Sequence, residues 1–478
     1  MFIKEKFYKN IFINFTLANL SSLLLNFSVT SDTNLIVIFT IPIFFLYYKF
    51  LINKDQLFFI LILIFFSITS GTYYFAWMNV YSKMLYPLAT FVFLIFFSLS
   101  FIGDYLINKY ITNKIIFKSK KNYKQKLIPF FPFIWIILIY LLDKTTIGAF
   151  LYTFTYFFPL SSPFIKIFKV YGITFIILIF SQIIAYNLVF KNKKLIFISI
   201  FLYILFISFS IFYSLYYKDL LYNNFSKNYS DNKKIIKLRF ALIQGNFRES
   251  WEIRKNNVKL ILLTYINLTK EAFIKERFDI AIWPEYAIPG DIINDESLKN
   301  EISNLAKELN IYILTGCSPW IYNDPPYQNY NTAVLFDNNG KIIKSYYSVN
   351  PLPFDYDVKP GKSYEIFEIK GLKFAVQMCY EEVFDRITKI FINKYKVDFI
   401  VVLTNHALFD NLKGAYQTTL LSRIHASTYG KYILRATNSG YTMVISPTGK
   451  IKSKIPKQKR DYLVDEISII KDNSIINY

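Results

Sequence analysis

Apolar residues are arranged in two different ways along the 478-residue chain. In the first half they form long runs with few charges, whereas in the second half they alternate with polar residues as in an ordinary α/β protein. The pattern predicts a membrane-spanning helical domain over residues 1–222 and an α/β domain over residues 237–470. The polar segment 223–236 is predicted to be a linker, and residues 471–478 a tail.

Seven runs in the first half are close to the length of about 20 residues that a helix needs to cross a bilayer. They are approximately Ile11–Phe27, Leu35–Leu51, Leu57–Trp77, Leu85–Ile107, Ile128–Leu142, Phe168–Phe190 and Leu195–Tyr217. A further apolar run, Gly148–Leu160, is shorter and contains Pro159. We interpret this run as a re-entrant or interfacial segment.

The lysines between these runs predict the orientation of the domain. They concentrate before the first run and in the second, fourth and sixth loops, for example at positions 191, 193 and 194. Positively charged loops stay in the cytoplasm. We therefore expect a cytoplasmic N-terminus and seven crossings, which place the α/β domain outside the inner membrane, in the periplasm. An eighth crossing at Gly148–Leu160 would put the basic sequence 191–194 outside, against this rule.

Charge and composition exclude several other classes of protein. The formal net charge is +22, but much of the lysine lies in short loops and no basic face with interleaved aromatic residues is present, so no nucleic-acid partner is expected. Two cysteines, Cys317 and Cys379, give no disulfide framework. His406 and His425 lie apart and no glycine-rich phosphate loop occurs, so neither a metal nor a cofactor is predicted.

In the second half, β-rich runs alternate with helical patterns. The predicted strands are Leu238–Gln244, Ile280–Trp283, Ile311–Thr315, Thr332–Phe336, Phe374–Met378, Phe399–Leu403 and Tyr432–Arg435. Residues Ser297–Leu309 carry leucine and isoleucine on one helical face. The turn sequences Asp337–Gly340 and Ser446–Gly449 predict two hairpins. The result is a layered α/β domain of sufficient size for its own core.

Three predicted strands end in residues that can perform chemistry. Glu285 follows an apolar strand and a Trp-Pro pair, Cys379 lies between a strand and a predicted helix, and Asn405 ends a third strand. Sites in open α/β sheets lie at the carboxyl ends of strands. A cysteine at a helix start gains thiolate character from the helix dipole, and a nearby carboxylate can accept its proton. Taken alone, Cys379 fits a small buried hydrophobic residue equally well, and Glu285 a helix cap.

Together these residues resemble the nitrilase (carbon–nitrogen hydrolase) superfamily, whose signature is a Glu after Trp-Pro, a Lys before a short turn and a Cys after a strand. Further segments match the family's opening, middle and late strands: Leu242–Asn246, Asn331–Val334 and Leu434–Gly440. A nitrilase domain placed after membrane helices resembles the bacterial apolipoprotein N-acyltransferase family. The resemblance implies a multi-span helical membrane domain followed by a nitrilase-like αββα sandwich.

The resemblance also implies a mechanism. Glu285 would be the general base that activates Cys379, and Cys379 would take an acyl chain from a phospholipid as a thioester. The α-amino group of a diacylglyceryl-cysteine lipoprotein would then accept the chain. Tyr380 and Glu381 match the family's Cys-Tyr-Glu and would shape the substrate site, and Trp251 matches a tryptophan that contacts substrate.

The chain departs from the family pattern where the lysine is expected. An alignment without gaps from Gly340 to Phe354 puts Ser348 at the lysine position. The family's lysine stabilises a developing oxyanion, which is usually a large contribution, and a serine hydroxyl is neutral and shorter. Lys344 lies four residues earlier on the same face of a regular strand and is the candidate replacement.

Other family motifs are altered as well. The family's Pro-Phe-Gly-Glu becomes Pro-Phe-Asp-Tyr at 353–356, where Asp355 or Asp357 is the candidate carboxylate. Its Asn-Asp-Ala-Trp-Phe-Gly becomes Asn-His-Ala-Leu-Phe-Asp at 405–410, and Arg-Ala-x-Glu becomes His-Ala-Ser-Thr at 425–428, which loses both charges. No apolar run long enough to span a membrane follows these motifs, so the family's final membrane helix is not expected.

Three functions therefore compete. Glu285, Cys379 and the topology favour an acyltransferase. Ser348 and the missing final helix favour a catalytically degenerate membrane protein that binds lipid or lipoprotein. Amide or nitrile hydrolysis is the third, disfavoured because such enzymes are mostly soluble and also need the lysine.

Overall fold

The protein was analysed as a computed structural model. It describes residues 11–23, 36–53, 56–75, 85–116, 128–142, 163–227, 234–249, 251–321, 328–352, 355, 357–407 and 413–471. The chain forms two compact units, Met1–Leu215 and Tyr216–Tyr478.

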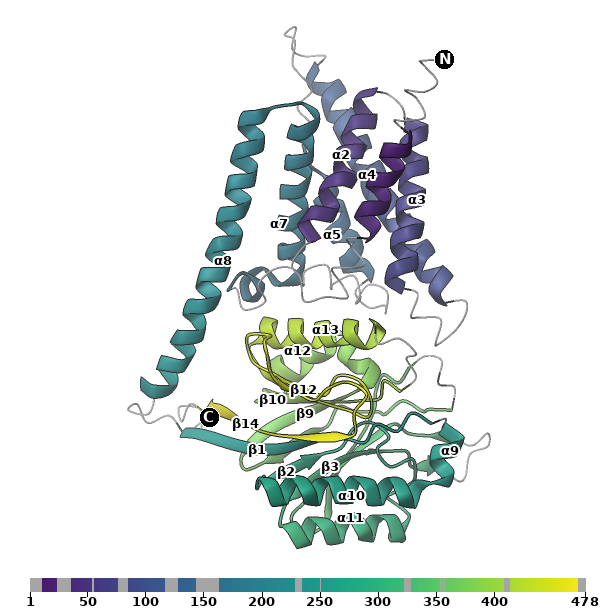
Figure 1. Ribbon diagram of the computed structural model, residues 1–478, viewed down its shortest axis with the longest axis vertical. Helices are drawn as coiled ribbons and strands as arrows, with labels where there is room; N and C mark the ends of the chain where they lie inside the picture. Colours follow the sequence, from purple (N-terminus) through teal and green to yellow (C-terminus); the bar gives the residue numbers. More distant parts are fainter. Residues whose placement is uncertain are drawn as a thin grey trace. The chain divides into compact units, whose positions relative to one another are not determined.

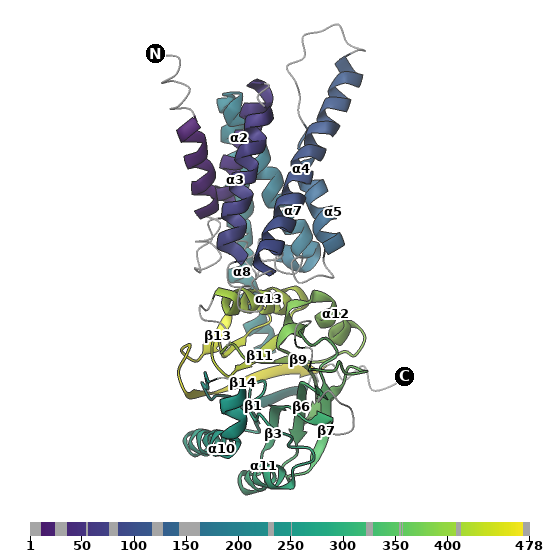
Figure 2. The same cartoon turned by 90° about the vertical axis from the view of Figure 1, so that its right-hand side faces the viewer.

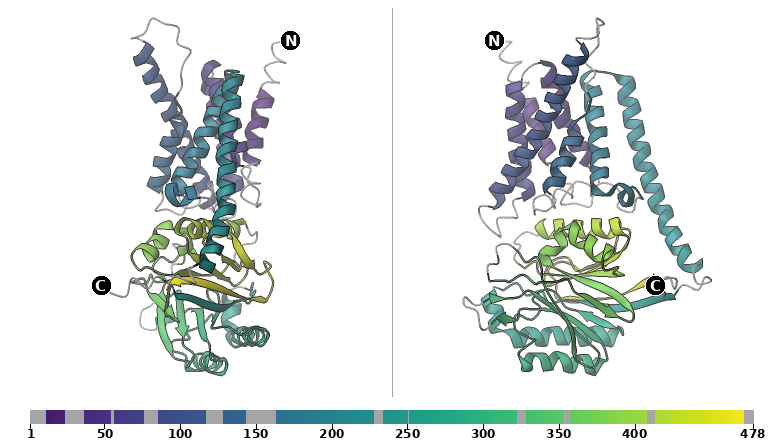
Figure 3. Two further views of the ribbon diagram at one scale, coloured as in Figure 1. Left: turned by 90° about the vertical axis from the view of Figure 1, so that its left-hand side faces the viewer. Right: turned by 180° about the vertical axis from the view of Figure 1, so that it is seen from behind.

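The first unit is built from apolar helices, drawn in purple to teal in Figure 1 and seen from two further sides in Figure 3. They are Ile11–Leu23, α2 (Ile36–Asn53), α3 (Gln56–Phe75), α4 (Leu85–Ile116), α5 (Phe131–Leu142), α7 (Pro163–Val189) and α8 (Lys193–Lys227). Among the described residues, three segments are long and apolar enough to cross a membrane: Pro87–Ile111, Phe164–Val189 and Lys193–Tyr213. The predicted helical membrane domain is thus confirmed, while the number and direction of the crossings stay predictions. The predicted re-entrant run Gly148–Leu160 lies outside the described residues.

A buried carboxylate ties the start of α5 to α4. Asp104 Oδ1 accepts hydrogen bonds from the backbone N–H groups of Phe130 and Phe131 at 2.7 and 2.8 Å, and from Gln182 at 3.1 Å. Asp104 Oδ2 accepts from the Tyr47 hydroxyl at 2.7 Å. Because apolar surroundings offer no water, polar groups must be paired internally. Asp104 therefore serves as a cap that fixes where α5 begins.

The boundary between the halves differs from the predicted linker 223–236. Helix α8 continues to Lys227, and strand β1 begins at Lys234. The polarity of a sequence alone does not end a helix. At the far end, β14 reaches Lys471, the first residue of the predicted tail.

The second unit contains two six-stranded sheets. The first has the order β14-β1-β2-β3-β6-β7 and the second the order β13-β12-β11-β10-β9-β8. The strands of the first sheet are β1 (Lys234–Gln244), β2 (Ile280–Ile282), β3 (Tyr312–Cys317), β6 (Thr332–Phe336), β7 (Ile342–Tyr347) and β14 (Asp461–Lys471). Those of the second are β8 (Ile366–Ile369), β9 (Leu372–Met378), β10 (Phe399–Thr404), β11 (Tyr432–Thr437), β12 (Met443–Ile445) and β13 (Ile451–Lys454). A small ribbon pairs β4 (Trp320–Ile321) with β5 (Gln328–Asn329).

Helices cover the outer face of each sheet, so the unit has four layers (Figure 2). Helices α10 (Val258–Lys275) and α11 (Glu296–Leu309) pack on the first sheet, and α12 (Asp385–Asn393) and α13 (Lys413–Tyr429) on the second. Side chains of a strand alternate between its two faces. In β1, Phe240 and Leu242 accordingly lie in the core between the sheets, whereas Ala241 and Ile243 face the helices. The predicted αββα architecture is confirmed.

Parallel strands bring the predicted chemistry to one edge. Strands β9, β10 and β11 are parallel neighbours, with Met378 opposite Leu403 and Thr404 opposite Thr437. The residues that follow these parallel strands therefore meet at their carboxyl ends, as the sequence predicts.

Both predicted turns also form, since Gly340 N–H bonds to Asp337 O and Gly449 N–H bonds to Ser446 O.

Candidate active site

Cys379 lies in a sharp turn directly after β9. Its backbone φ is 42°, a left-handed conformation that is uncommon outside glycine, and the chain enters the short 3₁₀-helix η3 (Cys379–Val383) there. The thiol is partly buried. Thr404 Oγ1, at the end of β10, donates to Cys379 Sγ at 3.4 Å. Strained backbone concentrates at functional sites, and this turn presents the sulfur at the edge of the sheet.

Glu285 follows β2, and its carboxyl group interacts electrostatically with the Cys379 thiol. Its side chain is 5% exposed, and Asn331 Nδ2 donates to Oε1 at 2.7 Å. The pKa of Glu285 is raised to about 7, chiefly by burial and also by the Asp355 charge, against the lowering effects of Cys379 and Asn331. A carboxyl that is half ionised near neutral pH and interacts with a thiol is suited to general-base catalysis.

The expected thiolate character of Cys379 is not found. Burial first, and then the charge of Glu285, raise the pKa of the Cys379 thiol well above its usual value. The helix that begins here is a 3₁₀-helix of five residues, and its dipole is too small to reverse these effects. Cys379 therefore rests as a neutral thiol, and proton transfer to Glu285 must accompany its attack.

Ser348, the residue at the lysine position, lies just after β7. Its backbone is held by bonds from its N–H to Asn331 O at 2.8 Å and from Gly361 N–H to its carbonyl at 2.7 Å. The side chain is buried next to the Glu381 carboxylate, without a hydrogen bond of normal geometry. Lys344 points elsewhere, because its Nζ contacts Glu365 at 3.3 Å and Ile366 O at 3.0 Å. Neither residue brings a cation to Cys379.

Glu381 is fully buried and its oxygens are occupied. Oε1 accepts from the Tyr346 hydroxyl at 2.7 Å and from the N–H groups of Val349 and Asn350 at 2.9 and 3.0 Å. Oε2 accepts from Met378 N–H at 2.9 Å. A role for Glu381 in shaping the substrate site stays a prediction. Glu381 is a positioning residue that joins the loop after β7 to the turn that carries the nucleophile.

The other two predicted substrate residues are described in part. Tyr380 is partly buried, and its ring packs edge-to-face on Phe384 with centroids 5.0 Å apart. Trp251 begins α9 (Trp251–Asn256), but its side chain is not among the described atoms. Asp355 is exposed and acts electrostatically on Glu285. A role for Tyr380 and Trp251 in binding substrate stays a prediction.

Comparison with known proteins identifies the second unit. Residues 239–470 match the carbon–nitrogen hydrolase family. This part of the chain is a carbon–nitrogen hydrolase domain.

Relatives of the domain include two proteins named apolipoprotein N-acyltransferase. The protein from Wigglesworthia glossinidia brevipalpis is 32% identical over 273 residues, which cover 51% of this chain and 52% of that protein. The protein from Aquifex aeolicus is 27% identical over 246 residues, 48% of this chain and 54% of that protein. The chain thus spans about half the length of the curated relatives that it matches.

Solved structures show a likeness of lower degree. Saccharomyces cerevisiae Nit3, a nitrilase superfamily member, aligns with a TM-score of 0.41 and 19% identity over 48% of this chain and 89% of its own. An amidase from Nesterenkonia sp. aligns with a TM-score of 0.39 and 17% identity, over 48% of this chain and 90% of its own.

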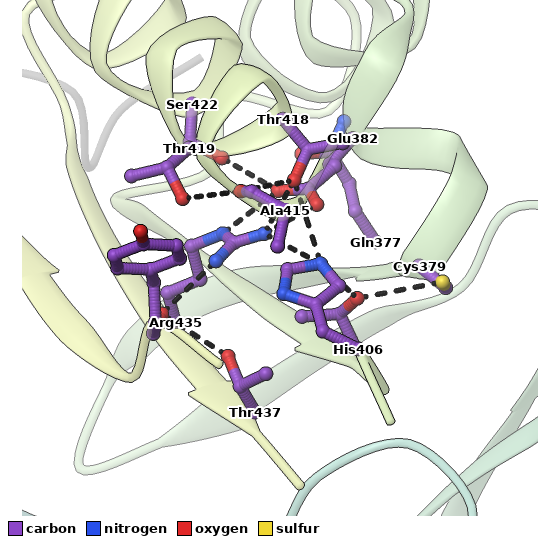
Figure 4. Close-up of polar contacts among 12 residues, drawn as sticks. Gln377, Cys379, Glu382, His406, Ala415, Thr418, Thr419, Ser422, Arg435 and Thr437 are labelled. Carbon is purple, nitrogen blue, oxygen red and sulfur yellow. Dashed lines mark hydrogen bonds and ion pairs between the residues drawn. The ribbon is translucent and has the colours of Figure 1, made fainter. Parts of the chain in front are cut away.

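A buried ion pair in the carbon–nitrogen hydrolase domain was not predicted from the sequence. Arg435, within β11, binds Glu382 through two contacts. Nη2 lies 2.6 Å from Oε1, and Nε lies 2.9 Å from Oε2. Both side chains are almost completely inaccessible to solvent. Figure 4 shows the Arg435 guanidinium with Glu382 and Thr418 on one side and His406 on the other. The available signal was an arginine inside an otherwise apolar strand, which requires a buried partner.

Two further polar residues beside Glu285 were also missed. Asn331 was noted only as part of a strand motif, yet it is the donor to Glu285. Arg254 on α9 is buried and donates from Nη2 to Tyr286 O at 2.5 Å, and its charge acts on Glu285. Burial lowers the pKa of Arg254. These contacts depend on loop geometry, and no local sequence pattern reports them.

Proposed function

We propose that the chain transfers a fatty acyl group from a phospholipid to the N-terminal amine of a diacylglyceryl-cysteine lipoprotein, through a thioester on Cys379. The observation that carries the proposal is the buried Glu285 carboxyl, with its pKa raised to about 7, acting on the Cys379 thiol in a carbon–nitrogen hydrolase domain that follows apolar helices. Relatives named apolipoprotein N-acyltransferase support this choice of reaction.

The first half-reaction makes the thioester. Ionised Glu285 takes the proton of the Cys379 thiol while Sγ attacks the ester carbonyl of the phospholipid. The ester C–O bond breaks, and the lysophospholipid oxygen leaves with the proton that Glu285 returns. Cys379 then carries the acyl chain, and Glu285 is again ionised.

The second half-reaction releases the acyl chain to the acceptor. The neutral amine attacks the thioester carbonyl, and Glu285 takes a proton from the nitrogen. The C–S bond breaks, the sulfur regains its proton from Glu285, and an amide is formed. No oxidant, metal or cofactor enters the balance of either half-reaction, so none is proposed.

Membrane helices suit this reaction because both substrates are anchored in the bilayer. We propose that the chain lies in the inner membrane with its N-terminus in the cytoplasm and the carbon–nitrogen hydrolase domain in the periplasm. The distribution of loop lysines supports this orientation. In this arrangement the partners are a phospholipid donor and a lipoprotein acceptor, and no nucleic acid.

A binding protein that has lost catalysis is the second candidate, favoured by the neutral Ser348. Complementation of a bacterial strain depleted of its own N-acyltransferase distinguishes the two. Wild type and Cys317→Ala, which alters a buried cysteine in β3, are expected to restore growth, whereas Cys379→Ala is not. Ser348→Lys is expected to raise the transfer rate by adding a positive charge. Growth with Cys379→Ala would instead indicate a binding role.

A further inference from the structure

A hydrogen-bond donor from the end of β10 reaches the Cys379 sulfur. It is the Thr404 hydroxyl, with Oγ1 3.4 Å from Sγ. This donor is neutral, and it contacts the atom on which negative charge forms when Glu285 takes the thiol proton.

The backbone that carries the Thr404 hydroxyl is fixed in place. Asn405 Oδ1 accepts from Ala407 N–H at 3.1 Å and from Asn438 Nδ2 at 3.0 Å. Asn438 N–H in turn bonds to Thr404 O at 3.1 Å, and Asn438 Nδ2 also donates to Phe247 O at 2.7 Å. Asn438 thereby joins the ends of β1 and β10. Donors that do not have to reorganise during a reaction stabilise charge more effectively.

The direction of the Thr404 hydrogen is determined by His406. The hydroxyl has one hydrogen and two neighbours that can accept it, Cys379 Sγ and His406 Nε2 at 3.3 Å. His406 Nε2 also lies 3.4 Å from Arg435 Nη2. A guanidinium can only donate, so Nε2 is the acceptor in that contact and carries no proton. Burial and the Arg435 charge lower the pKa of His406 and keep the ring neutral.

The lone pair of His406 Nε2 is therefore already engaged by Arg435. Thr418, the other hydroxyl near this atom, uses its hydrogen on Ala415 O at 3.0 Å. The Thr404 hydrogen is left for the sulfur, which becomes the stronger acceptor once it is ionised. The titratable groups that face Cys379 are Glu285 and Tyr286, both from the segment after β2.

The ion pair with Glu382 fixes the Arg435 guanidinium that contacts His406. Glu382 Oε2 also accepts from Ser422 at 2.7 Å, and Arg435 Nη1 donates to Tyr441 O at 2.9 Å (Figure 4). A buried ion pair with its polar atoms satisfied contributes little net stability but can specify one geometry. Glu382 provides the carboxylate for Arg435.

We propose that the Thr404 hydroxyl stabilises the negative charge that forms on Cys379, and that Arg435 and Glu382, acting through His406, are positioning residues for Thr404. The inference rests on the proposed acyl transfer, in which the sulfur becomes negative when it attacks and again when it leaves. The charge on the Cys379 sulfur is then stabilised by a neutral hydrogen-bond donor, in a site where Ser348 supplies no cation.

The test is the pH dependence of alkylation of Cys379 by iodoacetamide in the full chain in detergent micelles. All variants carry Cys317→Ala, so that one thiol reports. Thr404→Val, which keeps the shape and removes the hydroxyl, is expected to slow alkylation at neutral pH roughly tenfold and to move the profile to higher pH. Thr404→Ser, which keeps the hydroxyl, is expected to stay within about twofold of the parent. An unchanged profile for Thr404→Val would overturn the proposal.

A double-mutant cycle tests the positioning role. Replacement of the whole ion pair, Arg435→Met with Glu382→Gln, is expected to slow alkylation, because His406 Nε2 can then accept the Thr404 hydrogen. It is expected to have little further effect when Thr404→Val is present, because both changes act through one hydroxyl. Independent, additive effects would overturn the role of the ion pair. Alkylation needs neither phospholipid nor lipoprotein. A chain that alkylates as expected but transfers no acyl group would therefore contradict the proposed function alone.

Discussion

Replacing Glu285 with Gln is predicted to stabilise the carbon–nitrogen hydrolase domain relative to wild type, and to do so more at pH 8 than at pH 4.5. The folded state raises the pKa of Glu285 from 4.5 to about 7, chiefly through burial. The folded domain therefore binds this proton more tightly than the unfolded chain does. The stability that the protonated carboxyl provides is present below pH 4.5 and is lost as the pH rises to about 7.

The size of the effect follows from the shift. At about 1.4 kcal/mol per pKa unit, the wild-type domain loses about 3 kcal/mol at this site between pH 4.5 and pH 8. Gln has the same shape, can still accept from Asn331, and does not titrate. The difference in unfolding free energy between Glu285→Gln and wild type is thus expected to grow by about 3 kcal/mol in favour of the variant.

Pulse proteolysis of the full chain in micelles, over a urea series at several pH values, measures this difference. The matched control is Glu301→Gln, on the exposed side of α11, which is expected to change stability by less than about 0.5 kcal/mol. A difference between Glu285→Gln and wild type that stays constant with pH would refute the desolvation of this carboxyl, and with it the assignment of Glu285 as a base tuned to neutral pH.

Three other predictions follow from the site. The initial rate of acyl transfer is expected to rise with pH through about 7, because Glu285 must be ionised to take the proton; a rate that falls over pH 6 to 8 would contradict this. Glu382→Gln is expected to cost about 3–5 kcal/mol in urea unfolding, since it leaves the buried Arg435 charge unpaired; a loss below about 1 kcal/mol would argue against the pair. Gly440→Ala is expected to destabilise the domain by about 1–3 kcal/mol and to slow alkylation of Cys379, because φ is +131° and the new Cβ would lie 2.6 Å from His406 Nδ1; wild-type stability would show that the ring moves aside.

The sequence predicts the parts of this molecule that depend on periodicity. Long apolar runs specify the helices of the first unit, and short apolar runs rich in β-forming residues specify strands such as β6, whose predicted bounds Thr332–Phe336 agree with the structure. Because three parallel strands end at one edge, the sequence also places Cys379 and Asn405 close together. These predictions need only local patterns and one rule of sheet topology.

Contacts between distant buried polar groups could not be predicted in this way. The bond from Asn331 to Glu285 joins two loops, and the Arg435–Glu382 pair joins β11 to the 3₁₀-helix after β9. Glu381 could be noticed by its motif, but only the loop after β7 shows that its oxygens are already occupied. The pKa of Cys379 likewise depends on burial and on a carboxylate from the other sheet, which outweigh the local effect of a helix start.

The most direct test of the proposed function is mass spectrometry of Cys379 after the purified chain has been incubated with phospholipid alone. The proposed mechanism predicts an acyl group on a peptide that contains Cys379, labile to neutral hydroxylamine as a thioester is, and lost on addition of a lipoprotein acceptor. The acyl group should be absent from Cys379→Ala and from Glu285→Gln. A chain that binds phospholipid but leaves Cys379 unmodified would contradict acyl transfer by this site.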